Sequence, residues 1–342
     1  MQNIKFGLGT FGDMSLDDQG NPESFGQVLR NVVEQAKLAD ELGLDTFVIG
    51  EHHRDDYSVS APDTLLAAIA SVTKNIKLST GVTVLSSEDP VRVYQRFATI
   101  QAISNGRAQI TAGRGSFIES FPLFGFELSD YADLFEEKLE LLLELLKEQP
   151  VTWSGNHTPS FRNQEVYPKT ETPIPLHVGV GGSPESVIRA ARLGVPMALA
   201  IIGGDPARFA PFANLYRQKL AELGKAELPI SIHSPGFVAE SDESAIETQW
   251  PHHEVAFGRV GEERGWPPIT KEHFLAEVRG GSLYVGSPET VANKIAYAIT
   301  SLGATGFDLK YSTGPMPHSK LMRCIELYAT QVVPRVKNLL KI

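Results

Sequence analysis

Two histidines, a small-residue stretch and an arginine stand where successive buried strands are expected to end. Glu51-His52-His53 closes one apolar run, Gly81-Val82 interrupts the next, and Arg114 lies between two glycines after the third. The runs follow one another at about 30 residues, the length of one strand, one helix and two loops. Since the carboxyl ends of parallel strands share one rim, we expect these side chains to converge there.

The Glu51-His52-His53 run fits more than one role. Imidazole and carboxylate groups are metal ligands, but neighbouring side chains of a strand point to opposite faces, so only one histidine can face a given site. The spacings HExxH and HxxEH are also absent. We therefore predict no metal site and interpret one of the two histidines, His52 or His53, as a proton donor and acceptor, with Glu51 or a backbone group fixing its tautomer. A histidine satisfied by local hydrogen bonds is the alternative.

A glycine-rich turn follows the fifth expected strand. Gly181, Gly182, Ser183 and Ser186 stand at the start of a helix, where amides and hydroxyls together suit a phosphate-sized anion. Neither the dinucleotide spacing GxGxxG nor a Walker loop fits this run, because Pro184 takes the last glycine position and no Gly-Lys-Ser/Thr follows. A plain βα turn with an N-cap serine is the alternative.

The other two features are less specific. Arg114 carries a fixed charge suited to a phosphate, a carboxylate or an electron-rich ring edge, with a surface ion pair as the alternative. Gly81 before Val82 weakens an apolar strand, which predicts the close approach of a flat ligand or an unusual backbone.

An alternation of strands and helices positions these groups. Near-continuously apolar runs, typical of strands in a buried parallel sheet, predict strands at 4–9, 45–50, 76–84, 107–112, 174–180, 196–202, 229–238 and 306–311. Helical periodicity predicts helices at 24–42, 61–73, 90–104, 130–149, 184–193, 205–223, 288–302 and 318–340. This order predicts an α/β fold, a (β/α)₈ TIM barrel with functional residues at the carboxyl ends of its strands.

We expect a single domain for 1–342. Two of its segments are longer than the connections that a strand–helix repeat needs. One is a connection at about 150–173, and the other is an insertion at about 240–285, between the seventh strand and its following helix. We interpret the insertion as an active-site lid, with peripheral packing on the barrel base as the alternative. The helix at 130–149 has an apolar arc wide enough for two buried surfaces, either a homodimer contact or burial beneath 150–173.

Composition argues against several classes of partner. The chain has 31 Lys and Arg against 41 Asp and Glu, a net charge of −10, and its basic residues are scattered, so we expect no binding to nucleic acid or to an anionic membrane. No apolar segment reaches the ~20 residues that span a bilayer, and no export signal is recognisable. The single cysteine, Cys324, cannot form an internal disulfide, so we expect a cytoplasmic protein.

Taken together, these runs resemble the bacterial luciferase family of flavin-dependent monooxygenases. The similarity begins at 4–7 and 51–53, continues through 81–82, 104–107, 114–115 and the glycine-rich turn, and reaches 284–289 and 303–306. The order and spacing of the runs carry the resemblance, since no single motif is diagnostic.

The resemblance implies a barrel that holds FMN at its carboxyl rim, often in a homodimer. His52 matches the family's catalytic histidine, and Gly81-Val82 matches a cis peptide bond that lies against the flavin ring. The remaining residues that we expect to bind the cofactor are Glu51, Arg114, Gly181, Gly182, Ser183 and Ser186.

The implied chemistry is a monooxygenation. Reduced FMN, delivered by a separate NAD(P)H-dependent flavin reductase, would react with dioxygen to give a flavin hydroperoxide that oxidises a small organic substrate. Phe11, Phe117, Phe121 and Phe124 would form a dry wall at the rim. Gly113 stands where luciferases have a reactive cysteine, so we do not expect light emission.

Two alternatives keep the same fold. One is a deazaflavin- or flavin-dependent oxidoreductase that transfers hydride without dioxygen. The other is a flavin-binding protein without turnover, which would keep the glycine-rich turn and be indifferent to the loss of His52.

Overall fold

The computed structural model describes residues 4–115 and 117–342. Parallel strands in this part of the chain form a closed ring in the order β1 (Lys5–Thr10), β2 (Thr46–Ile49), β3 (Lys77–Thr80), β5 (Ala108–Gly113), β8 (Leu176–Val180), β9 (Met197–Ala200), β10 (Ile230–Val238) and β12 (Gly306–Lys310). Phe6 pairs with Phe307, which closes β12 onto β1. The expected α/β fold, a (β/α)₈ TIM barrel, is confirmed.

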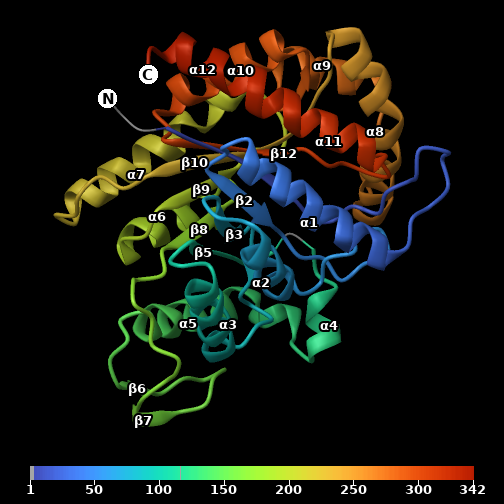
Figure 1. Cartoon of the computed structure of the whole chain (residues 1–342). Coiled ribbons are helices and arrows are strands. Elements are labelled where there is room, and N and C mark those ends of the chain that lie inside the picture. The colour runs from blue at the N-terminus through green and yellow to red at the C-terminus, as the bar shows by residue number, and fades with distance from the viewer. Residues whose placement is uncertain (1–3, 116) are drawn as a thin grey trace.

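Helices surround this ring (Figure 1). They are α1 (Phe25–Glu41), α2 (Pro62–Val72), α3 (Pro90–Ile103), α4 (Ser120–Phe124), α5 (Tyr131–Leu145), α6 (Pro184–Leu193), α7 (Ala210–Glu222), α8 (Asp242–Arg264), α9 (Lys271–Gly280), α10 (Pro288–Leu302), α11 (His318–Leu327) and α12 (Val333–Leu340). Several begin with a serine or aspartate N-cap followed by proline, as α3, α6 and α10 do. No helix in the described ranges is long and apolar enough to cross a membrane.

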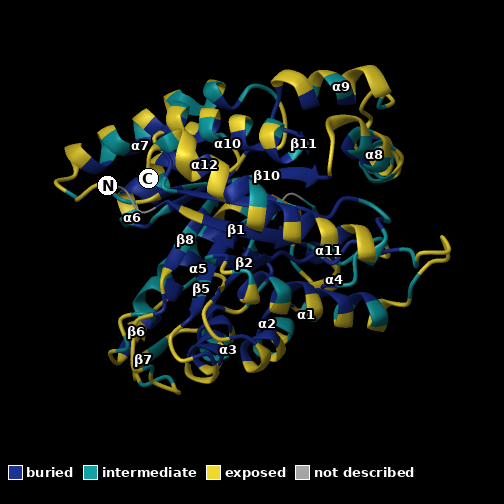
Figure 2. Ribbon diagram, turned by 45° about the horizontal axis from the view of Figure 1, so that its top comes forward, coloured by how far each residue is buried: buried dark blue, intermediate teal, exposed yellow. Residues whose placement is uncertain are grey.

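The core lies between the strands and the helices. Buried residues follow the strands and the inner faces of the helices (Figure 2), and the strand residues among them include Phe6, Leu8, Phe307 and Leu309. Alternate residues point into the barrel, where Asp308 lies 3.1 Å from His233 Nε2. The interior is therefore more polar than the near-continuously apolar pattern suggested.

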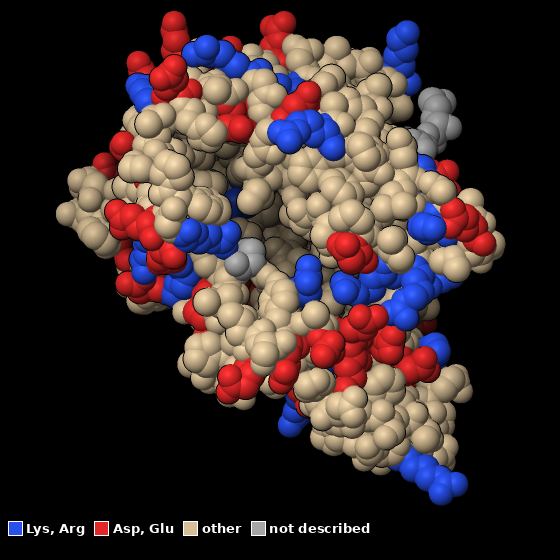
Figure 3. Space-filling model, turned by 180° about the vertical axis from the view of Figure 1, so that it is seen from behind, with Lys and Arg blue, Asp and Glu red and all other residues tan. Residues whose placement is uncertain are grey.

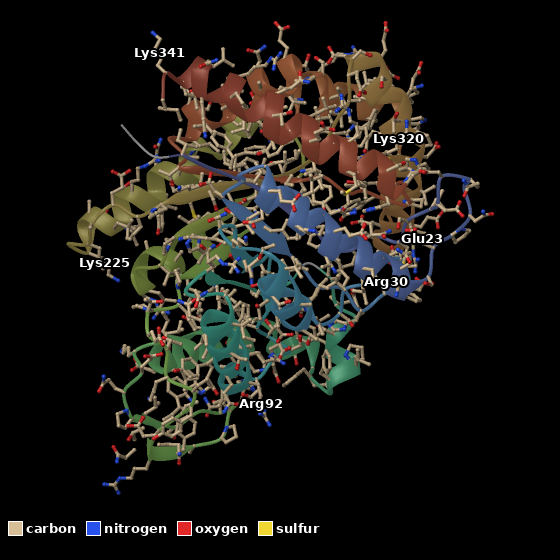
Figure 4. The ribbon with its side chains drawn as sticks, in the orientation of Figure 1. Glu23, Arg30, Arg92, Lys225, Lys320 and Lys341 are labelled. Carbon is tan, nitrogen blue, oxygen red and sulfur yellow. The ribbon has the colours of Figure 1, made fainter. Side chains whose placement is uncertain are left out.

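Charged side chains are distributed over the outer surface. Arg30, Arg92 and Lys320 project outward from three different helices, α1, α3 and α11 (Figure 4). Acidic and basic groups are interspersed on the face seen from behind (Figure 3).

Several expected boundaries differ from the structure. The strand predicted at 76–84 is divided into β3 and β4 (Thr83–Val84), and the peptide bond between Gly81 and Val82, which lies between the two strands, is cis. The helix predicted at 318–340 is interrupted by a π-helical turn at Tyr328–Val332, just before Pro334, whose missing amide hydrogen cannot continue the ladder. The helix predicted at 130–149 ends at Leu145.

The 150–173 segment contains a small hairpin of β6 (Val151–Trp153) and β7 (Phe161–Gln164). It lies against α5, where the Glu137 carboxylate accepts hydrogen bonds from the amides of Asn156 (2.7 Å) and His157 (3.0 Å). The segment therefore lies next to the helix, as one of the two explanations for its wide apolar arc requires. The segment precedes β8, so it lies at the amino end of the barrel, opposite the rim of interest.

Helices α8 and α9 and strand β11 (Tyr284–Gly286) occupy 240–285. Strand β11 pairs in parallel with the end of β10, and α8 and α9 stand together at one side of the barrel (Figure 1).

Candidate functional site

A cleft opens at the carboxyl ends of the first strands. It is lined by Phe11, Glu51, His52, His53, Gly81, Val82, Val84, Gly115, Phe117, Glu119 and Ser120. The space-filling view has a hollow near the middle of its face (Figure 3). The structure thus brings the histidines of the second strand and the 81–82 segment together, as the spacing predicted.

An aromatic cage encloses His52. The imidazole lies 4.7 Å from the ring centroid of Phe11, 4.5 Å from that of Tyr57 and 4.4 Å from that of Phe117. Its backbone amide donates to the carbonyl of Val59 at 3.0 Å. Burial in this cage lowers the pKa of His52, which favours the neutral imidazole.

The acid that faces His52 is not the one that the sequence suggested. Glu119, which follows β5, has its Oε1 3.7 Å from His52 Nδ1. This distance allows an ion pair but exceeds that of a direct hydrogen bond. Glu51 instead approaches His53, with 3.9 Å between Oε1 and Nε2. All three residues follow the end of β2 at Ile49, in a loop whose course pairs Glu51 with His53 and leaves His52 facing Glu119.

Glu51 is itself a buried carboxyl group. Burial raises its pKa, the nearby Glu88 adds to the rise, and the contact with His53 opposes it. Glu51 therefore lines the cleft as a carboxyl group with a tendency to stay protonated.

The expected cis peptide bond between Gly81 and Val82 is present. It turns the Val82 side chain toward the neighbouring strands, where only glycines leave room for it. A Cβ atom on Gly113 would lie 2.6 Å from Val82 Cγ2, and one on Gly179 would lie 2.8 Å from Val82 Cγ1. The absence of a side chain at Gly113 therefore has a packing reason.

A second cluster lies at the start of α6. Ser183 caps this helix, since its Oγ accepts from the amide of Ser186 at 3.3 Å, and the two hydroxyls share a hydrogen bond of 2.8 Å. Arg114 reaches the cluster from the end of β5 and donates to Ser186 Oγ at 3.4 Å. Gly182 has a φ of +98°, a conformation that favours glycine, and the neighbouring Gly181 is exposed.

Arg114 is not held in a surface ion pair. No carboxylate in the described ranges lies within ion-pair distance of its guanidinium, which stacks instead 5.0 Å from the ring centroid of Tyr131. Two serine hydroxyls, the first amides of α6 and an uncompensated guanidinium together fit a phosphate group. The structure thus unites Arg114, Gly182, Ser183 and Ser186.

A second hollow adjoins the His52 cleft. Gly115 lines the His52 cleft and also a second, apolar hollow of about 260 Å³ formed with Ile118, Leu128 and Tyr131. Tyr131, which lines this second hollow, also stacks on Arg114 of the anion cluster.

Helix α8 lies over the rim loop that follows His53. Arg54 forms ion pairs with Asp56 and, on α8, with Glu263, while Arg259 of α8 lies 2.5 Å from Asp55. Arg264, also on α8, stacks 5.1 Å from the ring centroid of Phe117. This position beside the cleft suits the lid interpretation of 240–285.

Sequence reasoning assigned no role to several residues of the site. Asp13 and Lys310 form an ion pair of 2.9 Å, and Lys310 Nζ lies 5.0 Å from the ring centroid of Phe11. Lys310 could have been found as a charge at a strand end, and Glu119 as an acid in the run that contains Arg114. Asp13 and Tyr57 carry no such signal. Of the expected aromatic wall, Phe124 contacts His53 and Phe121 contacts Tyr131.

No group of three or more His, Cys, Asp or Glu side chains that could hold a metal ion occurs in the described part of the chain.

Comparison with known proteins places this geometry in a wider context. Residues 5–306 match the family model described as "Luciferase-like monooxygenase". The F420-dependent glucose-6-phosphate dehydrogenase of Amycolatopsis mediterranei is 29% identical over 175 residues, which cover 48% of this chain and 51% of the dehydrogenase.

Two solved structures share the fold over nearly the whole chain. The monooxygenase RslO1 of Streptomyces bottropensis has a TM-score of 0.84 and 24% identity, covering 97% of this chain and 99% of its own. The oxygenating constituent of 3,6-diketocamphane monooxygenase of Pseudomonas putida, a complex with FMN, has a TM-score of 0.79 and 18% identity, covering 97% and 98%.

Proposed function

The chain belongs to the luciferase-like monooxygenase family, a family of flavin- and F420-dependent oxidoreductases, and from this membership we propose that it is an FMN-dependent monooxygenase. It would use reduced FMN and dioxygen to oxidise a small organic substrate. The observation that carries the proposal is that a phosphate-sized cluster and a caged histidine both stand at the carboxyl ends of barrel strands, after β8 and after β2.

The anion cluster suits the FMN phosphate. The hydroxyls of Ser183 and Ser186, the amide of Gly182 and the guanidinium of Arg114 would hold it, because charge-assisted hydrogen bonds from several donors favour a dianion. The first turn of α6 adds its amides and the positive end of its dipole. Riboflavin, which lacks the phosphate, would forgo these contacts.

The cleft suits the flavin ring. The segment Gly81-Val82 would lie against it, and Glu51 and Gly181 would line the two ends of the cofactor site. His52 would hold or release a proton at its Nε2, a buried atom that has no partner among the described residues. An unpartnered buried nitrogen of this kind is satisfied when a ligand supplies the missing hydrogen bond.

When bound, reduced FMN would supply two electrons to dioxygen, and with two protons one oxygen atom would enter the substrate while the other would leave as water. The protein must keep bulk water away during this step. Phe11, Tyr57 and Phe117 surround His52 for that purpose, and α8 covers the adjoining loop. These largely apolar walls favour a small, apolar or carbonyl-bearing substrate.

The proposal includes the wider setting implied by the resemblance. Reduced FMN would come from a separate NAD(P)H-dependent flavin reductase, and the protein would act as a cytoplasmic homodimer composed of single-domain subunits.

The test begins with binding under anaerobic conditions. Reduced FMN, reduced riboflavin and the deazaflavin F420 are titrated against the purified protein, and the FMN complex is then mixed with dioxygen while flavin oxidation and peroxide release are followed. We expect preference for FMN, and with aldehydes or ketones in ¹⁸O₂ we expect one labelled oxygen in the product. Tighter binding of F420, with hydride transfer and no oxygen uptake, would favour the dehydrogenase branch of the family instead.

A further inference from the structure

The contact between His52 and Glu119 joins two segments that are distant in sequence. His52 follows β2, and Glu119 lies in the loop between β5 and α4. The 3.7 Å between Nδ1 and Oε1 places a carboxylate at one nitrogen of the ring, while the other nitrogen, Nε2, has no partner in the described part of the chain. The two nitrogens of His52 are therefore in different environments.

No other described carboxylate takes this position. Glu51 faces His53, and Asp13 is occupied by Lys310, which binds it at 2.9 Å, and by the hydroxyl of Ser312 at 2.7 Å. Tyr57, Phe11 and Phe117 present rings to His52, and Lys310 and Asp13 act on it only through their opposite charges at longer range. Glu119 is therefore the acid that can act directly on the ring.

The surroundings of Glu119 favour its ionised form. Although burial favours its neutral form, the contact with His52 and the charge of Arg54 hold the pKa of Glu119 below its ordinary value. Its side chain is 23% exposed, which leaves it partly solvated while the His52 side chain is only 9% exposed. An ionised acid beside a caged imidazole is the arrangement by which a carboxylate selects a histidine tautomer.

We propose that Glu119 is a positioning residue that holds the proton of neutral His52 on Nδ1 and so leaves Nε2 as the nitrogen that meets a bound ligand. The tautomer of His52 is a property of the free protein and does not depend on the proposed function. Only the effect of Glu119 on turnover rests on the proposed function. The loop that carries Glu119 also carries Arg114, whose bond to Ser186 fixes the far end of that loop.

Nitrogen NMR of protein labelled with ¹⁵N-histidine tests the proposal without any cofactor. The His52 signals are identified by their loss in His52→Gln, and its tautomer and titration are then compared between the parent, Glu119→Gln and Glu119→Ala. Glu127→Gln is the matched control. Glu127 is an exposed residue just after α4, and its side chain has no partner among the described residues.

We expect the Nδ1–H tautomer to dominate in the parent and in the control. Glu119→Ala should lose this preference, since it removes the carboxylate beside Nδ1. Glu119→Gln keeps a polar oxygen there but not the charge, so the pKa of His52 should fall by about one unit. If both variants show the same His52 tautomer and the same His52 pKa as the parent, the proposal is overturned.

Turnover supplies the second readout. Glu119→Ala should lower kcat for substrate oxidation at least tenfold while the Kd for FMN changes less than threefold, because Glu119 acts through His52. Equal kcat in the two proteins would also refute the positioning role. If FMN does not bind even the parent, the proposed function fails while the NMR result still decides the tautomer.

Discussion

Removing the two serine hydroxyls at the start of α6 is the sharpest test of how this site recognises its ligand. The perturbation is Ser183→Ala combined with Ser186→Ala, which deletes the hydroxyls that now share a 2.8 Å hydrogen bond beside Arg114. We expect weaker binding of FMN and unchanged binding of riboflavin, because only FMN carries the phosphate that these hydroxyls would contact.

The magnitude follows from the kind of bond that is lost. A hydrogen bond to a charged group contributes about 1.5–3 kcal/mol, but the two hydroxyls already satisfy each other in the free protein, so the net loss should lie near the lower end. Together they should cost roughly 2–3 kcal/mol, which is about 30- to 150-fold in Kd. Arg114 and the helix amides remain, so some preference for FMN over riboflavin should persist.

The substitution has a structural side effect that needs a control. Ser183 is the N-cap of α6, and the loss of a serine cap costs about 1 kcal/mol of stability. The chain offers a matched control at 287–290, where Ser287 caps α10 and shares a 3.3 Å hydrogen bond with Thr290. There the turn faces Asp242, which accepts from Thr290 Oγ1 at 2.9 Å and would repel an anion.

The assay is calorimetric titration of FMN and riboflavin into three proteins, with thermal unfolding measured for each. The double variant at the start of α6 should lose affinity for FMN alone, and Ser287→Ala with Thr290→Ala should lose similar stability with no change for either ligand. Parallel weakening of FMN and riboflavin would refute the assignment of a phosphate site.

Three further predictions concern the interior of the site and the barrel. His52→Ala should lower substrate oxidation roughly 100-fold or more while FMN affinity stays within a few-fold; equal turnover would remove its proposed role. Gly113→Ala should destabilise the fold by about 1–3 kcal/mol, because the new Cβ would lie 2.6 Å from Val82 Cγ2, and adding Val82→Ala should recover part of the loss in urea unfolding; additive losses would contradict this packing account. Burial lowers the pKa of His253 to about 4 from its ordinary 6.5, so between those values the unfolded chain binds the extra proton and stability falls as pH falls. His253→Gln should reduce this pH dependence of the free energy of unfolding, between pH 6.5 and 5, by up to about 1.4 kcal/mol per pH unit. Urea unfolding at several pH values measures it, and the same pH dependence in the parent and the variant would contradict the assignment.

The strands and helices of the barrel were predictable because each carries its own signal. Apolar β-branched runs and helical periodicity located the barrel strands to within a few residues, as 306–311 against β12 (Gly306–Lys310) illustrates. The end of α5 carried no such signal. The chain turns at Glu148, a non-glycine residue with a φ of +58°, whose carboxylate accepts from the amide of Thr170 at 2.9 Å. That distant partner cannot be read from a local pattern.

The sequence predicted which residues lie at the rim, but it did not predict every contact between their side chains. Each strand ends at the same rim, so His52, Gly81-Val82 and Arg114 could be placed together from spacing alone. Glu51 or a backbone group was expected to orient the histidine, but the Glu51 carboxylate approaches His53, and the acid nearest to His52 is Glu119. Glu119 reaches His52 only because the loop after β5 folds across the rim.

The alternation of strands and helices follows from local sequence, and with it the rim at which the chemistry had to lie, because parallel strands of one barrel end on one side. What each rim group meets depends on the packing of elements that are distant in sequence. The turns at 183–186 and 287–290 have nearly the same sequence and the same cap, yet one faces Arg114 and the other Asp242. A local sequence fixes the donors that a turn presents, whereas the charge that stands opposite comes from another strand or helix and depends on how the elements pack.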